Sequence, residues 1–157
     1  MDSEITLNIR KRSTLKFIIF SIITLGWYIY VWIWKFVNDI NKLDFVQNKK
    51  LNFWKIMAIP IVLDMYNIYN TIITWDNDGF NSWDQFYFKI NGIIFLIISI
   101  ILLRKIEEYA QKKYNVSIKH SGLGIFFLAI LYVNFAINNF ENRVQKALDE
   151  QKQSGDI

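Results

Sequence analysis

The sequence predicts an all-α integral membrane protein with four hydrophobic helical segments. The chain of 157 residues is 53% hydrophobic and 17% aromatic, and its mean hydropathy is +0.18, which exceeds the usual composition of soluble domains. A soluble domain of this size keeps much of its surface exposed and cannot bury so much apolar area. The apolar residues also form runs long enough for a bilayer, with lysines and arginines gathered between them.

The first segment covers residues 15–37, has charges only near its ends, at Lys16 and Lys35, and shows no polar face. At ~1.5 Å per residue, one helix of this length could cross a ~30 Å hydrocarbon layer. Its second half, TLGWYIYVWIWKF, places aromatic rings where a headgroup boundary is more typical than a ligand pocket. No small-residue cleavage site follows the run, so we expect a membrane segment and not a cleaved signal peptide.

The other three segments cover residues 53–75, 86–103 and 123–140. Polar residues interrupt the second segment, the third contains the run GIIFLIISIILL, and the fourth begins apolar and ends in asparagines. The four segments together predict a single helical membrane domain over residues 1–144. We expect residues 145–157 to form a polar tail that frays in water.

Positive charge predicts the topology, because Lys and Arg stay on the cytoplasmic side of bacterial-type membranes. These residues precede the first segment and fill the connections before the second and fourth, whereas residues 76–84 contain none. We therefore expect the second and third segments to form a hairpin whose acidic tip faces outward. The basic connections should also attract anionic lipid headgroups, by ~1 kcal/mol per Lys or Arg close to the surface.

Both flanks of the first segment are basic, so two arrangements remain open for it. In one, the segment crosses once within a plain four-helix bundle, and the basic N-terminal tail lies outside. In the other, it is a re-entrant hairpin that breaks between Thr24 and Gly26, because glycine allows a tight reversal. Each arm would then be ~16 Å long, and its backbone polar groups would need shielding by protein.

Residues 16–43, KFIIFSIITLGWYIYVWIWKFVNDINKL, combine an aliphatic run, a Thr-Leu-Gly step, a tryptophan-containing aromatic run and an exit ending in Asn-Lys-Leu. With the basic tail before it, this order resembles a family of small bacterial membrane proteins known as domain of unknown function 4234. The chain has Gly26-Trp27-Tyr28-Ile29 where the family usually has a Gly-Ile-Tyr-Gly step. The resemblance implies a helical fold in the cell membrane and no particular chemistry.

Asp64 is the most informative single residue, because a carboxylate at bilayer depth costs ~2.5–3.5 kcal/mol on insertion scales and marks a functional candidate. At ~100° per residue, three polar residues share its helix face: Asn67, Thr71 and Thr74. We expect this polar stripe to face the interior of the bundle. Residues on other segments are its candidate partners: Lys89, Asn91 and Asn134.

The polar stripe has two interpretations. Interhelical hydrogen bonds, worth ~0.6 kcal/mol each on average, are favoured, because one acid without a second titratable partner makes a poor proton relay. An ion or proton pathway is the alternative. Pro60 lies four residues before Asp64, and a kink there would free a backbone carbonyl near the stripe.

Few residues could support catalysis or bind a metal. The chain has no cysteine and a single histidine, His120, which we expect to be solvated in a basic loop. A transition-metal site would lack ligands, and neither a phosphate-binding glycine loop nor a nucleophile turn is present. The sequence therefore predicts no enzyme activity, no cofactor and no metal site. The apolar runs favour lipid over nucleic acid as the partner of the basic residues.

These observations predict a multi-pass protein of the bacterial cytoplasmic membrane with an accessory role. It would act by helix packing against a membrane-protein partner or a second copy of itself, and by contact with anionic lipid. An oligomeric transporter or channel element that uses the polar stripe around Asp64 is the alternative. Bending of the bilayer by a wedge-shaped first hairpin is a third function class.

Overall fold

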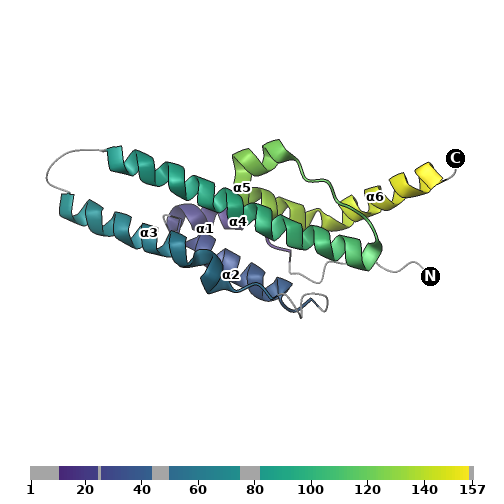
Figure 1. Ribbon diagram of the computed structural model, residues 1–157, viewed down its shortest axis with the longest axis horizontal. Coiled ribbons are helices and arrows are strands. Elements are labelled where there is room, and N and C mark those ends of the chain that lie inside the picture. The colour runs from purple at the N-terminus through teal and green to yellow at the C-terminus, as the bar shows by residue number, and fades with distance from the viewer. Residues whose placement is uncertain (1–10, 25, 44–49, 75–81, 156–157) are drawn as a thin grey trace.

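A computed structural model describes residues 11–24, 26–43, 50–74 and 82–155 of the chain, and all regular structure in these ranges is helical. Figure 1 shows an elongated bundle with α4 running along most of its length. The helices follow in the order α1 Thr14–Ile23, α2 Tyr28–Ile40, α3 Phe53–Thr74, α4 Ser82–Tyr114, α5 Gly122–Asn138 and α6 Phe140–Gly155. The all-α class is thus confirmed for the described residues.

The first predicted segment, residues 15–37, is divided into two helices. A turn around Gly26 separates α1 from α2, and the φ angle of Gly26 is +94°, a left-handed conformation that glycine adopts without steric cost. The Gly26 N–H donates to the Ser21 carbonyl at 2.7 Å, which closes the C-terminal end of α1. A single helix over residues 15–37 is therefore wrong, because the chain reverses at this glycine.

Thr24 connects α1 to α2. Its hydroxyl donates to the Phe20 carbonyl at 2.7 Å and accepts a hydrogen bond from the Tyr28 N–H at 2.8 Å. The ring of Phe17 in α1 packs edge-on against Trp32 in α2, with 5.4 Å between the ring centroids. α1 therefore folds back along α2, and the two helices form a hairpin.

α3 and α4 lie side by side along the long axis of the molecule (Figure 1) and pack against each other. α4 contains 33 residues and is therefore ~50 Å long. It includes the third predicted segment, residues 86–103, and continues without a break through the charged residues 104–114. The expected acidic tip consists of Asp76, Asp78 and Asp84. The first two lie outside the described residues, and Asp84 lies in the first turn of α4.

Among the described residues, one helix has the length and apolar composition to cross a membrane, and it covers Phe53–Ile73 of α3 with a mean hydropathy of 1.4. The prediction of four such helices is therefore wrong. The first segment is divided at Gly26, and the fourth is interrupted at Ala129, whose φ of 37° and ψ of −112° leave the helical range. Two shorter apolar helices remain, Thr14–Ile23 and Leu128–Asn138.

The buried core lies where α2, α4 and α5 meet. Its fully buried side chains include Ile33 and Phe36 of α2, Leu102 and Ile106 of α4, and Val133 and Ala136 of α5. α3 contributes the buried Met57 and Pro60, and its partly buried Phe53, Ile56 and Ile61 pack against the core. Only 11% of the apolar stretch within Phe53–Ile73 of α3 is buried inside the protein. The apolar surface of α3 therefore faces away from the core.

The C-terminal stretch 145–157, expected to fray, is helical as far as Gly155. α6 begins at Phe140, whose ring centroid lies 5.8 Å from that of Tyr109 near the end of α4. Val144, one turn later, is fully buried, and apolar residues continue at helical spacing to Ala147 and Leu148. This apolar stripe docks the first two turns of α6 on the bundle, whereas residues 149–153 of the same helix are exposed.

Candidate functional site

Asp64 lies half-buried in the middle of α3 and faces α2 and α4. Tyr30 of α2 donates its hydroxyl proton to one carboxylate oxygen, and Tyr87 of α4 donates to the other. The Asn91 amide also donates to Asp64 at 3.0 Å and to the Tyr87 oxygen at 2.9 Å. We call Tyr30, Asp64, Tyr87 and Asn91 the Asp64 cluster.

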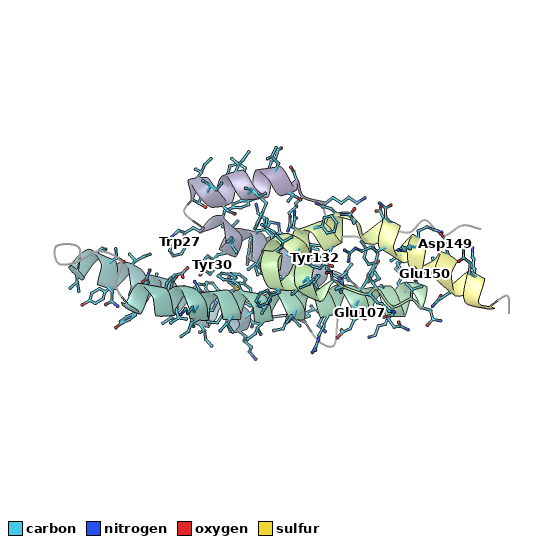
Figure 2. All side chains as sticks on the ribbon, turned by 90° about the horizontal axis from the view of Figure 1, so that it is seen from above. Trp27, Tyr30, Glu107, Tyr132, Asp149 and Glu150 are labelled. Carbon is cyan, nitrogen blue, oxygen red and sulfur yellow. The ribbon has the colours of Figure 1, made fainter. Side chains whose placement is uncertain are left out.

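Helix periodicity places the donors of the Asp64 cluster. Tyr30 shares the buried face of α2 with Ile33 and Val37, and its ring packs edge-on against Phe95 of α4, with 6.0 Å between the centroids. Figure 2 labels Tyr30 at this contact between α2 and the α3–α4 pair. Tyr87 and Asn91 are four residues apart on α4, so they occupy adjacent turns of one helix face.

Hydroxyl and amide groups compensate the charge of Asp64. Among the residues that the structure describes, no lysine or arginine pairs with this carboxylate. Hydrogen bonds to a charged group contribute ~1.5–3 kcal/mol each, and a carboxylate away from water needs such partners. The Asp64 cluster therefore links α2, α3 and α4 through one side chain.

The other residues of the polar stripe do not all face the interior. The Asn67 side chain is half-buried, and its oxygen is buried without a partner among the described residues. Thr71 is exposed, and its hydroxyl donates to the Asn67 carbonyl at 2.9 Å within α3. The Thr74 side chain lies outside the described residues. The structure thus turns Asp64 and Asn67 inward and Thr71 outward.

Of the three candidate partners of Asp64, the structure brings Asn91 to it. Lys89 is exposed. Asn134 of α5 is buried elsewhere, where its amide donates to the Thr14 hydroxyl at 2.9 Å.

The predicted break residues lie in different surroundings. Thr24 and Gly26 form the turn between α1 and α2, and Pro60 is buried within α3, which continues through it from Phe53 to Thr74.

Sequence reasoning missed the two tyrosines of the Asp64 cluster. The aromatic run predicts an interfacial position for Tyr30, but the spacing of Tyr30 from Ile33 and Val37 marks the buried face of a short helix. Tyr87 precedes Asn91 by four residues, a spacing that places both on one face of α4. That spacing could have identified Tyr87 once Asn91 was considered as a partner of Asp64.

His120 is half-buried, whereas a solvated side chain was expected. Its Nδ1 lies 3.2 Å from Nη1 of Arg143, and Arg143 also donates to the Tyr132 hydroxyl at 3.3 Å. Burial, together with the nearby charge of Arg143, lowers the pKa of His120 below its ordinary value. The uncharged imidazole therefore accepts the hydrogen bond from Arg143, which fixes the connection between α4 and α5 to the first turns of α6.

Comparison of the chain with protein-family models, with curated proteins and with solved structures found no match. The resemblance of residues 16–43 to domain of unknown function 4234 therefore stays a prediction.

Proposed function

We propose that this chain is a multi-pass protein of the bacterial cytoplasmic membrane that acts by packing its outer helix faces against a partner within the bilayer. The exposed face of α3 is the observation that supports this proposal most strongly. Its large apolar residues are more than half exposed, namely Trp54, Ile59, Val62, Met65, Tyr69, Ile72 and Ile73. Apolar area in water costs ~25 cal/mol per Å², and soluble monomers rarely expose contiguous apolar patches of this kind.

Exposed apolar side chains continue on the neighbouring helices. Leu15, Ile22 and Ile23 of α1 are each about two-thirds exposed, and more than half of the side-chain surface of Ile93 and Ile97 in α4 is exposed. Acyl chains or the helices of a partner would cover such surfaces without cost. α3 is the one described helix that is long and apolar enough to cross a membrane. The exposed faces of α1 and α4 support immersion of these helices in the bilayer as well.

The proposed topology places the α3–α4 pair across the membrane and the α1–α2 hairpin within one leaflet. The hairpin brings Lys16 and Lys35 to the same open end, so both flanks can stay at the cytoplasmic surface. α3 starts beside α2 near the middle of the long axis, and α4 continues past both toward the end of the molecule that carries α6 (Figure 1). Because the connections at that end are basic, we place that end on the cytoplasmic side of the membrane.

Lateral packing is favoured over chemistry at Asp64 because the Asp64 cluster is largely satisfied within the protein. Both carboxylate oxygens accept hydrogen bonds from neighbouring helices. Polar groups are thus directed inward, and the outer faces are left for van der Waals contact, which drives helix association in membranes. A second copy of the chain or a membrane-protein partner could supply the opposing face.

Extraction of isolated membranes tests the location. The full chain should stay in the pellet after alkaline carbonate washing and should dissolve in a mild non-ionic detergent. A peripheral protein would leave the pellet in carbonate. A folded, monodisperse chain in the aqueous fraction without any amphiphile would refute membrane insertion.

Single cysteines test the packing face, because the natural chain has none. Met65 of α3 is 61% exposed, whereas Met57 on the same helix is fully buried, so M65C and M57C form a matched pair. Oxidation in native membranes should cross-link M65C to a second copy or to a partner and leave M57C unchanged. Equal cross-linking of both variants, or of neither, would contradict packing through α3.

A transport role is the second candidate function, and one observation favours it. The side-chain oxygens of Asn67 and Asn91 are buried near Asp64 and have no partner among the described residues. Neutral oxygens beside a carboxylate are ligands that an alkali cation could use. Flux of Na⁺, K⁺ or H⁺ into liposomes containing the purified chain, abolished by D64N, would establish this role. The packing proposal predicts no such flux.

A further inference from the structure

A groove of about 550 Å³ lies between α1 and α2 at the open end of their hairpin. Four lysines line it, namely Lys11 before α1, Lys16 of α1, Lys35 of α2 and Lys42 after α2. Asp39 is the one carboxylate among the described residues that line it, and its oxygen lies 2.5 Å from the Arg12 guanidinium. The groove therefore carries an excess of positive charge.

Lys16 and Lys35 are the uncompensated charges of this groove. Lys11 pairs with Glu141 at 2.7 Å, and Lys42 lies 3.5 Å from Asp39. In the described part of the chain, neither Lys16 nor Lys35 forms an ion pair, and both are exposed. Two lysines on facing helices are thus free to bind one anion between them.

The groove becomes aromatic toward the turn of the hairpin. Phe20 packs against Tyr28 with 5.2 Å between ring centroids, and both rings line the groove. Trp32 also lines it and is only 1% exposed, yet its indole N–H is buried and has no acceptor among the described residues. A buried donor of this kind requires an acceptor, and the oxygens of a bound phosphate ester would provide one.

Contacts made by Arg12, which lines the groove, hold the groove in shape. The Arg12 carbonyl accepts a hydrogen bond from the Asn138 amide at 2.9 Å, and the Arg12 N–H donates to the Asn138 side-chain oxygen at 3.3 Å. With its guanidinium bound to Asp39, Arg12 ties the residues just before α1 to α2 and α5. A preformed groove reduces the entropy lost when a ligand binds.

We propose that this groove binds the phosphate of an anionic phospholipid headgroup. Lys16 and Lys35 contact the phosphate, the Trp32 N–H donates to an ester or phosphate oxygen, and the rings of Phe20 and Tyr28 cover the glycerol and the first methylene groups. The inference rests on the proposed membrane location and deepens it, because it assigns one defined site in place of a general attraction to basic connections.

The layout of the groove favours a phospholipid over free phosphate. The cationic residues lie at the mouth of the hairpin, and the aromatic residues lie one or two turns deeper, so the site has the polarity of an amphiphile. The exposed ring of Trp34 also lines the groove. Tryptophan at such a position is typical of the membrane interface.

Lipid binding to the purified full chain tests the inference. Native mass spectrometry in a non-ionic detergent would compare phosphatidylglycerol with phosphatidylcholine, which carries the same phosphate without net charge. We expect phosphatidylglycerol to bind at least tenfold more tightly. The double variant K16Q/K35Q should lose this preference, whereas K55Q/K119Q removes the same charge at exposed lysines outside the groove and should bind within twofold of the natural chain.

Two further measurements address the donor and the source of the phosphate. W32F keeps an aromatic ring but removes the indole N–H, so it should weaken phosphatidylglycerol binding several-fold, while W54F on exposed α3 should not. Millimolar inorganic phosphate should leave the bound lipid in place. Displacement by inorganic phosphate would overturn the lipid assignment and identify a free-phosphate site.

Failure of the inference can be told apart from failure of the proposed function. Equal losses in K16Q/K35Q and K55Q/K119Q, with unchanged helical circular dichroism, would overturn the groove as a lipid site. Carbonate resistance in the same preparations would still report the membrane location. Loss of helical content in K16Q/K35Q alone would be resolved with the single variants K16Q and K35Q, each of which should weaken binding on a folded chain.

Discussion

Tyr30 on α2 donates a hydrogen bond to the carboxylate of Asp64 on α3, although the two residues are 34 positions apart in the sequence. Tyr87 and Asn91 of α4 complete the set of donors. α3 has few fully buried apolar residues, so the Asp64 cluster adds a polar link between α3 and the two helices beside it.

Removal of the Tyr30 hydroxyl should therefore loosen α3. We expect Y30F to lower the free energy of unfolding by ~1.5–3 kcal/mol, because a hydrogen bond to a charged group is lost and the ring is kept. Denaturant unfolding in detergent, followed by circular dichroism, measures this change. Y69F, at an exposed tyrosine of α3, should be neutral. In a double-mutant cycle with D64N, the coupling energy should exceed ~0.5 kcal/mol, and additive effects would refute the bond.

The turn between α1 and α2 should depend on Gly26. Alanine has open space at this position, so the cost of G26A arises from the backbone, whose φ of +94° is unfavourable for an L-residue by ~1–2 kcal/mol. Gly92 in α4 also has open space but lies in a helix, and G92A should stabilise the protein by ~0.5–1 kcal/mol. Thermal unfolding of the two variants should shift in opposite directions. Shifts of the same sign would contradict the left-handed turn.

Gly124 should be required for the packing of Tyr132 at the start of α5. A Cβ atom at position 124 would lie 2.5 Å from the Tyr132 ring, which is nearly fully buried and whose oxygen accepts the Ser121 N–H at 2.8 Å. G124A should destabilise the protein by ~1–3 kcal/mol through this overlap. G122A places its methyl group in open space and serves as the control in the same unfolding assay. Equal behaviour of the two variants would mean that the ring is placed elsewhere.

The connection between α4 and α5 should weaken in mild acid because of His120. In the folded state, burial and the charge of Arg143 lower the pKa of His120. The charge of Glu107 raises this pKa, but by less. The unfolded chain binds the proton near pH 6.5, so between the two pKa values the unfolded state holds more protons and stability falls as the pH falls. Below the pKa of His120 in the folded state, the stability contributed by its neutral form is completely lost.

Unfolding measured between pH 7.5 and pH 5 tests this linkage, and H120Q, which cannot titrate, should flatten the dependence. An unchanged slope in H120Q would assign the pH dependence to other groups.

Much of the helical content follows from local patterns. The apolar runs predict α3 and the apolar part of α4, and the charged residues that follow continue α4 because they favour helix as well. The division of residues 15–37 was open, since Gly26 allows a reversal but a long apolar run is equally compatible with one helix. The break at Ala129 has no local signal, because alanine is the strongest helix former.

The sequence by itself determined that this chain is helical and unusually rich in apolar residues, and it singled out Asp64 as the carboxylate in the middle of a long apolar segment. The tertiary structure decided which groups compensate that carboxylate, where the first segment reverses, and that the C-terminal helix docks on the bundle. The physical reason is how far apart along the chain the interacting residues lie. Helix periodicity and charge are properties of neighbouring residues, whereas a hydrogen bond between Tyr30 and Asp64 exists only after two helices have packed at a particular register.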